Sequence, residues 1–528
     1  MSRSILKSTS KIGILALASR CIAFLREVLL IRFLSVGATS DIFFTAFRIP
    51  NTMRKIFAEG LLSSILVPAF INAEHKSGRT GINRLTTLAL FCIELTIFLF
   101  CIAICLYAQQ VIALIAPGFN MQKIQHSAQL LKILISFILF ISSGAIFAAA
   151  LQAQKHFFIP AIAPAILNVL YVSSLLTCLY YQCSIETFCY CMIATSIAYV
   201  IIHLASYLYM GFALQAPNDN SLQEFKTVIL QFIPCFISTG ILEINHFINT
   251  GFGSYLPSGS LTLIRYAFQF VNIPIGIIAA SLSTVLLPHF SKLHLESPEE
   301  MSSHIFEAIK FVIWSTLPIC FLLSFFSQEI FQTLFMGDME AMNKVPLAQS
   351  IFIAYLIGLL SFSLNKVFLS LFYALRLSFV PMIATTLSII INFTLNSLLL
   401  EQYQATGIAF ASSVASIVQT ICFLLFLHLH LKIKFYWQEY SIFLMRYLTQ
   451  LLFSCTLFWT LYRASHYIVE THPFAYRILG TNFSVTHHFF LQGIGIWFWA
   501  GPLSLLLLWL LYATRKNFAI SLAYLDKK

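Results

Sequence analysis

The segment DIFFTAFRIPNTMRKIFAEG, residues 41–60, carries a polar stripe along an otherwise apolar helix. At helical spacing the stripe consists of Asp41, Thr45, Arg48, Thr52, Lys55 and Glu59. An ionisable group at membrane depth costs at least ~2.5–3.5 kcal/mol, so lipid does not accept such a face. We therefore expect the stripe to line a hydrated cavity or to contact another helix, and we expect Pro50 to bend the helix among its charges.

The chain around this segment has the composition of a polytopic membrane protein. Of its 528 residues 59% are hydrophobic and only 10% are charged, too few charges to cover a water-facing surface. This excludes a soluble enzyme, a disordered chain and a disulfide scaffold. Apolar stretches separated by polar or Gly/Pro breaks predict an all-α integral membrane protein with 14 transmembrane helices, at 12–34, 41–72, 85–108, 129–153, 160–181, 186–209, 226–250, 261–290, 305–326, 347–374, 380–400, 405–431, 439–462 and 488–513.

The loop charges give this helix count an orientation. With the N-terminus inside, the basic residues of alternate loops favour the cytoplasmic side by about three to one. We therefore expect both termini in the cytoplasm.

An internal repeat divides the chain. Residues 62–70 (LSSILVPAF) align with 282–290 (LSTVLLPHF), and 155–163 (KHFFIPAIA) align with 376–384 (RLSFVPMIA) at nearly the same offset. Six helices fit into that offset, so the sequence predicts two six-helix pseudo-repeats in the same orientation followed by two C-terminal helices. The predicted parts are an N-terminal lobe at 1–215, a C-terminal lobe at 216–434 and a final pair of helices at 435–528.

The first two helices hold more bases than acids. Arg20, Arg26, Arg48, Arg54 and Lys55 outnumber the acids Glu27, Asp41 and Glu59, and the excess favours a cavity that binds an anion. Arginine predominates, and its planar fork suits phosphate or carboxylate recognition more than proton transfer. The alternative is a closed network of structural ion pairs in which the three acids neutralise most of the bases.

The second half of the chain is less charged. Arg265 is its candidate for anion binding, while Glu243, Asn245 and Asn392 form a weak candidate site for a monovalent cation. For these amides, hydrogen bonds to neighbouring helices are the commoner use. We find no spacing typical of a metal site, a nucleotide-binding loop or a catalytic constellation, so we expect no catalytic residues, no metal and no cofactor.

Several motifs resemble those of the MurJ/MviN family of bacterial lipid II flippases. They are Ser19-Arg20 with residues 24–27 (FLRE), residues 37–51 (GATSDIFFTAFRIPN), residues 54–60 (RKIFAEG), residues 116–119 (APGF), residues 158–164 (FIPAIAP) and residues 286–288 (LLP) with Ser291-Lys292. The resemblance implies the fold of the multidrug/oligosaccharidyl-lipid/polysaccharide exporter superfamily, with a central cavity and a groove for the lipid tail at helices 13 and 14. It implies functional importance for Arg20, Arg26, Asp41 and Arg54, with Lys55 and Glu59 beside them.

The sequence departs from the family pattern in the eighth helix. The family's basic cavity residue aligns with Gln269 and the preceding acidic residue with Phe268, so we expect Arg265, one turn earlier, to supply the base.

The resemblance implies a transporter, not an enzyme. It implies a flippase that moves undecaprenyl-diphosphate-linked disaccharide-peptide (lipid II) to the outer leaflet of the bacterial inner membrane by alternating access. Membrane potential or a monovalent cation is the expected energy source. Membrane lipids and cell-wall synthesis proteins are the other expected partners, and nucleic acid is not one. The alternatives are a drug/cation antiporter of the same superfamily, a membrane polyprenyl-phosphate glycan transferase and a purely structural scaffold.

Overall fold

The computed structural model describes residues 22–23, 25–57, 62–296, 300–377, 379–431, 437–471, 475–477, 484–486 and 493–522. The chain forms two compact units, Met1–Thr262 and Leu263–Lys528. The predicted six-helix lobes are drawn from the internal repeat of the sequence, and their boundaries stay a prediction.

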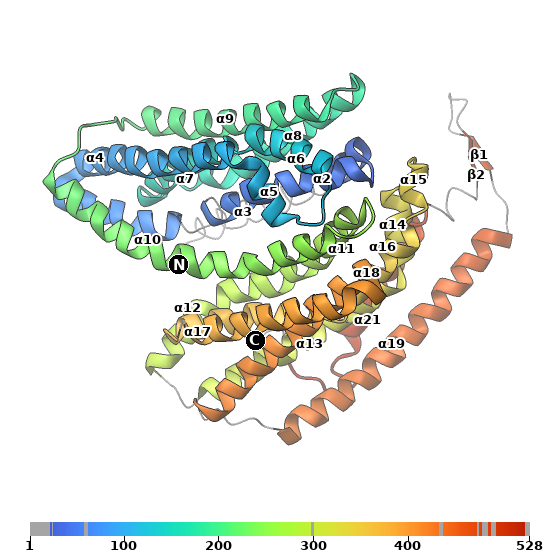
Figure 1. The fold of residues 1–528 in the computed structure, drawn as a ribbon. Coiled ribbons are helices and arrows are strands. Elements are labelled where there is room, and N and C mark those ends of the chain that lie inside the picture. Colours follow the sequence, from blue (N-terminus) through green and yellow to red (C-terminus); the bar gives the residue numbers. More distant parts are fainter. Residues whose placement is uncertain are drawn as a thin grey trace. The chain divides into compact units, whose positions relative to one another are not determined.

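The first unit is entirely helical in its described part (Figure 1). After a helical stretch at residues 25–34 its elements are α2 (Ala38–Ala46), α3 (Arg48–Ile56), α4 (Leu62–Leu106), α5 (Ala108–Ile115), α6 (Met121–Leu134), α7 (Phe137–Ala153), α8 (Phe158–Tyr180), α9 (Ile185–Tyr209), α10 (Asp219–Gly253) and the beginning of α11 (Ser260–Pro274). α7 packs against both α4 and α9. Small side chains in α7 allow this close approach, since a Cβ at Gly144 would overlap the ring of Tyr199.

In its described part the second unit is helical apart from one pair of short strands. It contains η2 (Ile275–Ala279), α12 (Ala280–Glu296), α13 (Met301–Phe325), α14 (Ser327–Leu334), α15 (Met339–Met342), α16 (Val345–Leu356), α17 (Leu359–Ala374), α18 (Phe379–Leu429), α19 (Trp437–Thr471), β1 (Ala475–Arg477), β2 (Ser484–Thr486) and α21 (Trp497–Thr514). The two strands pair antiparallel, with Tyr476 opposite Val485. A core of α12, α13, α17 and α18 side chains holds this unit together.

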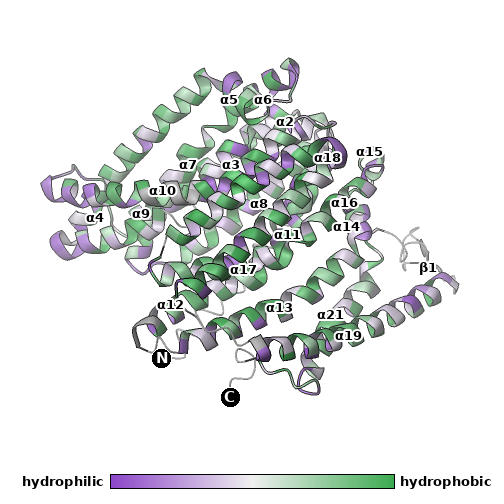
Figure 2. Cartoon of the chain, turned by 60° about the horizontal axis from the view of Figure 1, so that its bottom comes forward, coloured by the Kyte–Doolittle hydropathy of each residue, from purple (hydrophilic) through white to green (hydrophobic). Residues whose placement is uncertain are grey.

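Within the described residues, nine helices are long and apolar enough to cross a membrane, or ten if the bent pair α16 and α17 forms one span. Hydrophobic residues run along most helices and hydrophilic ones concentrate toward their ends (Figure 2). The chain is therefore a multi-pass, all-α membrane protein, as predicted. The count of 14 spans stays a prediction.

Two of these helices turn back on themselves. α4 has 45 residues and α18 has 51, far more than the ~20 that cross a bilayer. The backbone leaves helical geometry at Gly78 (φ 60°) and at Gln404 (φ 47°). A Cβ at Gly81 would overlap the carbonyl oxygen of Ala73, eight residues earlier, which is possible only if the chain reverses there.

The backbone bears out the internal repeat. The aligned residues Lys155 and Arg376 both have left-handed φ values, 61° and 57°. The next residue after each closes the preceding helix in the same way: His156 N–H donates to Leu151 O, and Leu377 N–H donates to Phe372 O. α8 and α18 then begin at Phe158 and Phe379, again 221 residues apart. The two lobes thus share a local turn that the sequence alignment located.

The last two helices pack on each other. Gln450 Nε2 in α19 donates to Leu511 O in α21 at 2.7 Å, and Tyr447 Oη donates to Trp314 O in α13 at 2.8 Å. Large apolar side chains on both helices remain exposed, among them Leu452 and Leu505, each 67% exposed. The groove for a lipid tail predicted for this pair stays a prediction.

Candidate functional site

The charged stripe of residues 41–60 is divided between two helices. Pro50 has no N–H to donate to the carbonyl of Ala46, and the helix breaks at this point. α2 ends at Ala46, Phe47 has φ −77° and ψ −6°, and α3 begins at Arg48. The bend expected from Pro50 is confirmed, and it separates Asp41 from the bases of α3.

Arg26 is held by its own helix and by α8. One guanidinium nitrogen donates to Asn168 Oδ1 at 2.9 Å and another to Glu27 Oε1 at 2.7 Å. The guanidinium carbon also lies 5.8 Å from the ring centre of Tyr171, within the range of a cation–π contact. About a third of the side chain remains accessible, at 30% exposed, so Arg26 is oriented without being enclosed.

Arg54 belongs to the same cluster. Its Nε donates to Asn51 Oδ1 at 3.3 Å. The Tyr171 hydroxyl interacts electrostatically with both Arg26 and Arg54, so the structure brings these two predicted arginines around one residue of α8. We call Arg26, Arg54, Asn168 and Tyr171 the arginine cluster. The contribution of α8 was not found from the sequence, because Asn168 and Tyr171 are ordinary residues of an apolar helix.

Lys55 forms an ion pair with the predicted cation-site residue Glu243. Lys55 Nζ lies 3.0 Å from both carboxylate oxygens of Glu243 in α10. The two side chains are 33% and 15% exposed. For Lys55 the closed ion-pair interpretation therefore fits the contacts, and Glu243 has a cationic partner within the protein.

The remaining members of the weak cation site, Asn245 and Asn392, belong to different units. Asn245 follows Glu243 in α10. Asn392 belongs to the second unit, where its Oδ1 accepts from Asn396 Nδ2 at 3.4 Å and from Ser412 Oγ at 3.5 Å. The contact with Ser412 links the two arms of α18, the commoner use of such amides. No group of three or more metal-ligating side chains occurs in the described part of the chain. A monovalent-cation site at these residues stays a prediction.

Exchanging the charges of Lys55 and Glu243 is expected to restore the membrane accumulation or transport that either single charge reversal removes. Lys55→Glu or Glu243→Lys places two like charges together in a half-buried contact and should reduce membrane accumulation or transport strongly. The double variant Lys55→Glu/Glu243→Lys re-forms the pair with its polarity inverted. Growth complementation and membrane levels of the three variants test this expectation.

Lys344 and Glu340 provide the matched control for this exchange. They form an exposed pair within one short segment, at 2.9 Å, and reversing them should have little effect. If the double reversal at Lys55 and Glu243 is as damaged as the singles, Lys55 has a role of its own beyond the ion pair.

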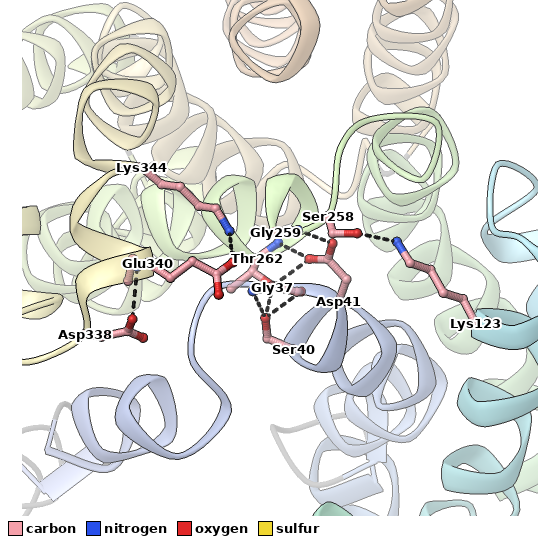
Figure 3. A network of polar contacts seen from close by, with 11 residues as sticks. Gly37, Ser40, Asp41, Lys123, Ser258, Gly259, Thr262, Asp338, Glu340 and Lys344 are labelled. Atoms are coloured by element: carbon pink, nitrogen blue, oxygen red, sulfur yellow. Dashed lines mark hydrogen bonds and ion pairs between the residues drawn. The ribbon is translucent and has the colours of Figure 1, made fainter.

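Among the described residues, Asp41 pairs with no arginine, which corrects the ion-pair prediction for Arg26, Arg48 and Arg54. Its carboxylate is 2% exposed and accepts hydrogen bonds from Gly259 N at 2.6 Å, Thr262 N at 2.9 Å and Thr262 Oγ1 at 2.7 Å (Figure 3). These donors lie at the beginning of α11, where helix N–H groups have no partner within the helix. Gly259 adopts φ 93°, a conformation that favours glycine. Asp41 therefore joins α2 to the start of α11.

The other predicted site residues are Arg48, Arg265, Arg20 and Glu59. Arg48 is half-buried at the start of α3. Arg265 is half-buried in the second unit, while Gln269 is exposed and Phe268 packs on Tyr355 with ring centres 5.2 Å apart. Arg20 and Glu59 lie outside the described residues.

The arginine cluster combines two guanidinium groups that donate to the neutral amides Asn168 and Asn51, and Arg26 donates in addition to the Glu27 carboxylate. Such an arrangement can bind phosphate or carboxylate oxygens through paired hydrogen bonds.

Two comparisons of sequence place the chain among known transporters. A family model described as lipid II flippase MurJ matches residues 30–477. A probable lipid II flippase MurJ from Buchnera aphidicola subsp. Schizaphis graminum is 30% identical over 398 residues, which cover 74% of this chain and 76% of that protein. A protein of the same description from Rhizobium tropici is 27% identical over 404 residues, covering 74% of each chain.

Solved structures support the same fold. A lipid II flippase MurJ in an inward closed conformation matches with a TM-score of 0.76 and 22% identity, covering 96% of this chain and 99% of that one. An inward-facing multidrug resistance transporter of the MATE family, in the MOP superfamily, matches with a TM-score of 0.64 and 13% identity, covering 76% and 92%. At these identities the structures establish the transporter fold, and the sequence matches across most of the chain establish the family: the chain belongs to the lipid II flippase MurJ family.

Proposed function

We propose that this protein is a transporter that moves lipid II from the inner to the outer leaflet of the bacterial cytoplasmic membrane for peptidoglycan synthesis. The observation that carries the proposal is the arginine cluster, in which Asn168 and Tyr171 contact Arg26 and the charges of Arg26 and Arg54 both act on Tyr171, in a chain of this family. The head group of lipid II is large and anionic, so it requires a basic, hydrated path, while its tail can stay in lipid.

The proposed mechanism is alternating access. Arg26 and Arg54 would bind the diphosphate or peptide carboxylates, and a rocking motion of one repeat against the other would expose them to each side in turn. Energy would come from the membrane potential or a monovalent-cation gradient. A drug/cation antiporter would instead need a surplus of acids in its cavity, and the first helices hold a surplus of bases.

The direct test is complementation combined with a flipping assay. The full-length protein should support growth of a bacterium depleted of its own flippase and should restore lipid II at the outer surface, measured by its accessibility to an added reagent. Growth without surface lipid II, or drug efflux without flipping, would contradict the proposal.

Topology supplies an independent check. We expect a reporter at residue 78 and reporters at both termini to give cytoplasmic signals, and reporters in 109–126 and 464–487 to give periplasmic signals. The physical reason is the excess of lysine and arginine in the loops assigned to the inside. A periplasmic signal at residue 78 would contradict the helix count and the cytoplasmic position of both termini.

A further inference from the structure

Glu94 is a half-buried acidic residue of the first unit, outside the arginine cluster. It lies in the second arm of α4, residues 79–106, roughly 20 Å from either end at 1.5 Å per residue. Its Oε1 is 2.7 Å from Ser142 Oγ in α7. Cys101 Sγ, further along α4, contacts Ile135 O just before α7. This arm thus runs antiparallel to α7 and places Glu94 in the middle of the helix pair.

In the part of the chain that the structure describes, no base accompanies this carboxyl group. Among the residues that the structure describes, Glu94 interacts with Ser142, Ser143 and Cys101, and with no lysine, arginine or histidine. Its Oε2 is buried without a hydrogen-bond partner in the same set. An ionised carboxylate in this position would therefore be both desolvated and uncompensated.

The helices packed against α4 supply no countercharge near Glu94. α7 and α5 contain no titratable residue. In α6, Lys132 lies at the level of Cys105, eleven residues further along α4. α10 brings Glu224 to Lys76, which belongs to the other arm of α4. The bases of α3, Arg48, Arg54 and Lys55, reach α7 but have no contact with Glu94.

The hydrogen-bond geometry fits a protonated acid. Ser142 Oγ lies 2.7 Å from Glu94 Oε1 and also 2.9 Å from the carbonyl oxygen of Ile138. A hydroxyl has one hydrogen. When Ser142 donates this hydrogen to the carbonyl oxygen of Ile138, the hydrogen in the 2.7 Å contact between Ser142 Oγ and Glu94 Oε1 must come from the carboxyl group. A chain of hydrogen bonds from Glu94 to Ser142 to Ile138 then forms without a buried charge, and Glu94 Oε2 keeps no partner among the described residues.

We propose that Glu94 is a proton-binding site, occupied while α4 and α7 are packed as they are here. The ligand is a single proton exchanged with water when the contact between these helices opens. Protonation would then be linked to the packing of α4 on α7, so a change of that packing during transport would take up or release a proton. This inference does not depend on which lipid the protein moves.

Carbodiimide labelling tests the proposal on the intact protein. Dicyclohexylcarbodiimide is lipid-soluble and reacts with protonated carboxyl groups, and neighbouring Phe91 and Leu95 are 67% and 45% exposed, which opens this face to a reagent from lipid. The wild-type chain in nanodiscs of phosphatidylethanolamine and phosphatidylglycerol should be labelled at Glu94 at pH 7. Labelling should fall about tenfold per pH unit once the pH exceeds the midpoint of the group.

Glu243 is the matched internal control because its carboxylate is paired with Lys55. At pH 7 we expect Glu94 to react at least about tenfold faster than Glu243, because the Glu243 carboxylate is engaged by the Lys55 ammonium group. Peptide mass spectrometry distinguishes the two sites, and Glu94→Gln should abolish the label. Equal rates at Glu94 and Glu243, or a rate at Glu94 independent of pH, would overturn the proposal.

A second measurement does not depend on reagent access. Because the folded state holds the proton, raising the pH through its midpoint removes stability from the wild type but not from Glu94→Gln. The melting temperature of the wild type should therefore fall relative to that of Glu94→Gln as the pH rises from about 5 to the midpoint of the group, and the difference should level off at higher pH. Parallel curves for the two proteins would contradict proton binding at this site.

Discussion

Arg26→Ala and Arg54→Ala are each expected to abolish, or nearly abolish, complementation of a flippase-depleted bacterium while the protein still accumulates in the membrane. A charge-assisted hydrogen bond contributes ~1.5–3 kcal/mol, so losing one weakens lipid II binding roughly ten- to a hundredfold. Arg26→Lys and Arg54→Lys should retain only part of the activity, because lysine is a point donor and cannot reproduce the planar fork. Native mass spectrometry of the variants with lipid II measures the binding directly.

Arg32 provides the control for this effect. It lies on the same helical stretch as Arg26 but is exposed, so Arg32→Ala should leave binding and growth close to those of the wild type. Asn168→Leu should give an intermediate phenotype, since it removes the 2.9 Å hydrogen bond that orients Arg26 and keeps the guanidinium itself. Full binding and full complementation by both alanine variants would leave these arginines as structural partners of Glu27 and Asn51.

The helices were largely predictable because they follow from local composition. Apolar runs located every helix that could span a membrane, and Pro50 located the break between α2 and α3. The reversal of α4 was harder to predict. The charges of residues 74–84 suggested a loop, but charged residues are compatible with a helix, and a single residue, Gly78, is enough to reverse the chain.

The partners of the charged residues were not predictable from local sequence. Lys55 and Glu243 lie 188 residues apart, and no periodicity connects them. Asp41 finds its main partners among backbone N–H groups, which every residue except proline possesses and which therefore leave no mark in a sequence. The acid that the sequence grouped with the arginines thus acts elsewhere, and Glu94 escaped attention because a single acid in an apolar run carries no motif.

Asp41→Ala is expected to destabilise the protein by about 3–5 kcal/mol, more than the loss of an ordinary helix cap, which costs about 0.5–2 kcal/mol. The reason is that the variant leaves two buried backbone donors without an acceptor, the N–H groups of Gly259 and Thr262, and leaves the Thr262 hydroxyl with only its 2.9 Å contact to Ser40 Oγ. Asp41→Asn should fall between alanine and the wild type, because the amide keeps one acceptor oxygen but turns an N–H group toward the remaining donors.

Thr262→Val separates the side-chain bond from the backbone bonds at this contact. It removes the Thr262 hydroxyl, which donates to Asp41 at 2.7 Å, and keeps the N–H group that donates at 2.9 Å, so its melting temperature should drop less than that of Asp41→Ala. In the double variant the two losses should not add, because the hydroxyl bond is already absent once Asp41 is gone. Arg26 and Arg54 remain intact in these variants, so lipid II binding to the surviving folded protein should persist. If Asp41→Ala instead melts like the wild type but no longer binds lipid II, the carboxylate acts on the substrate, and its contacts with α11 are not what makes it important.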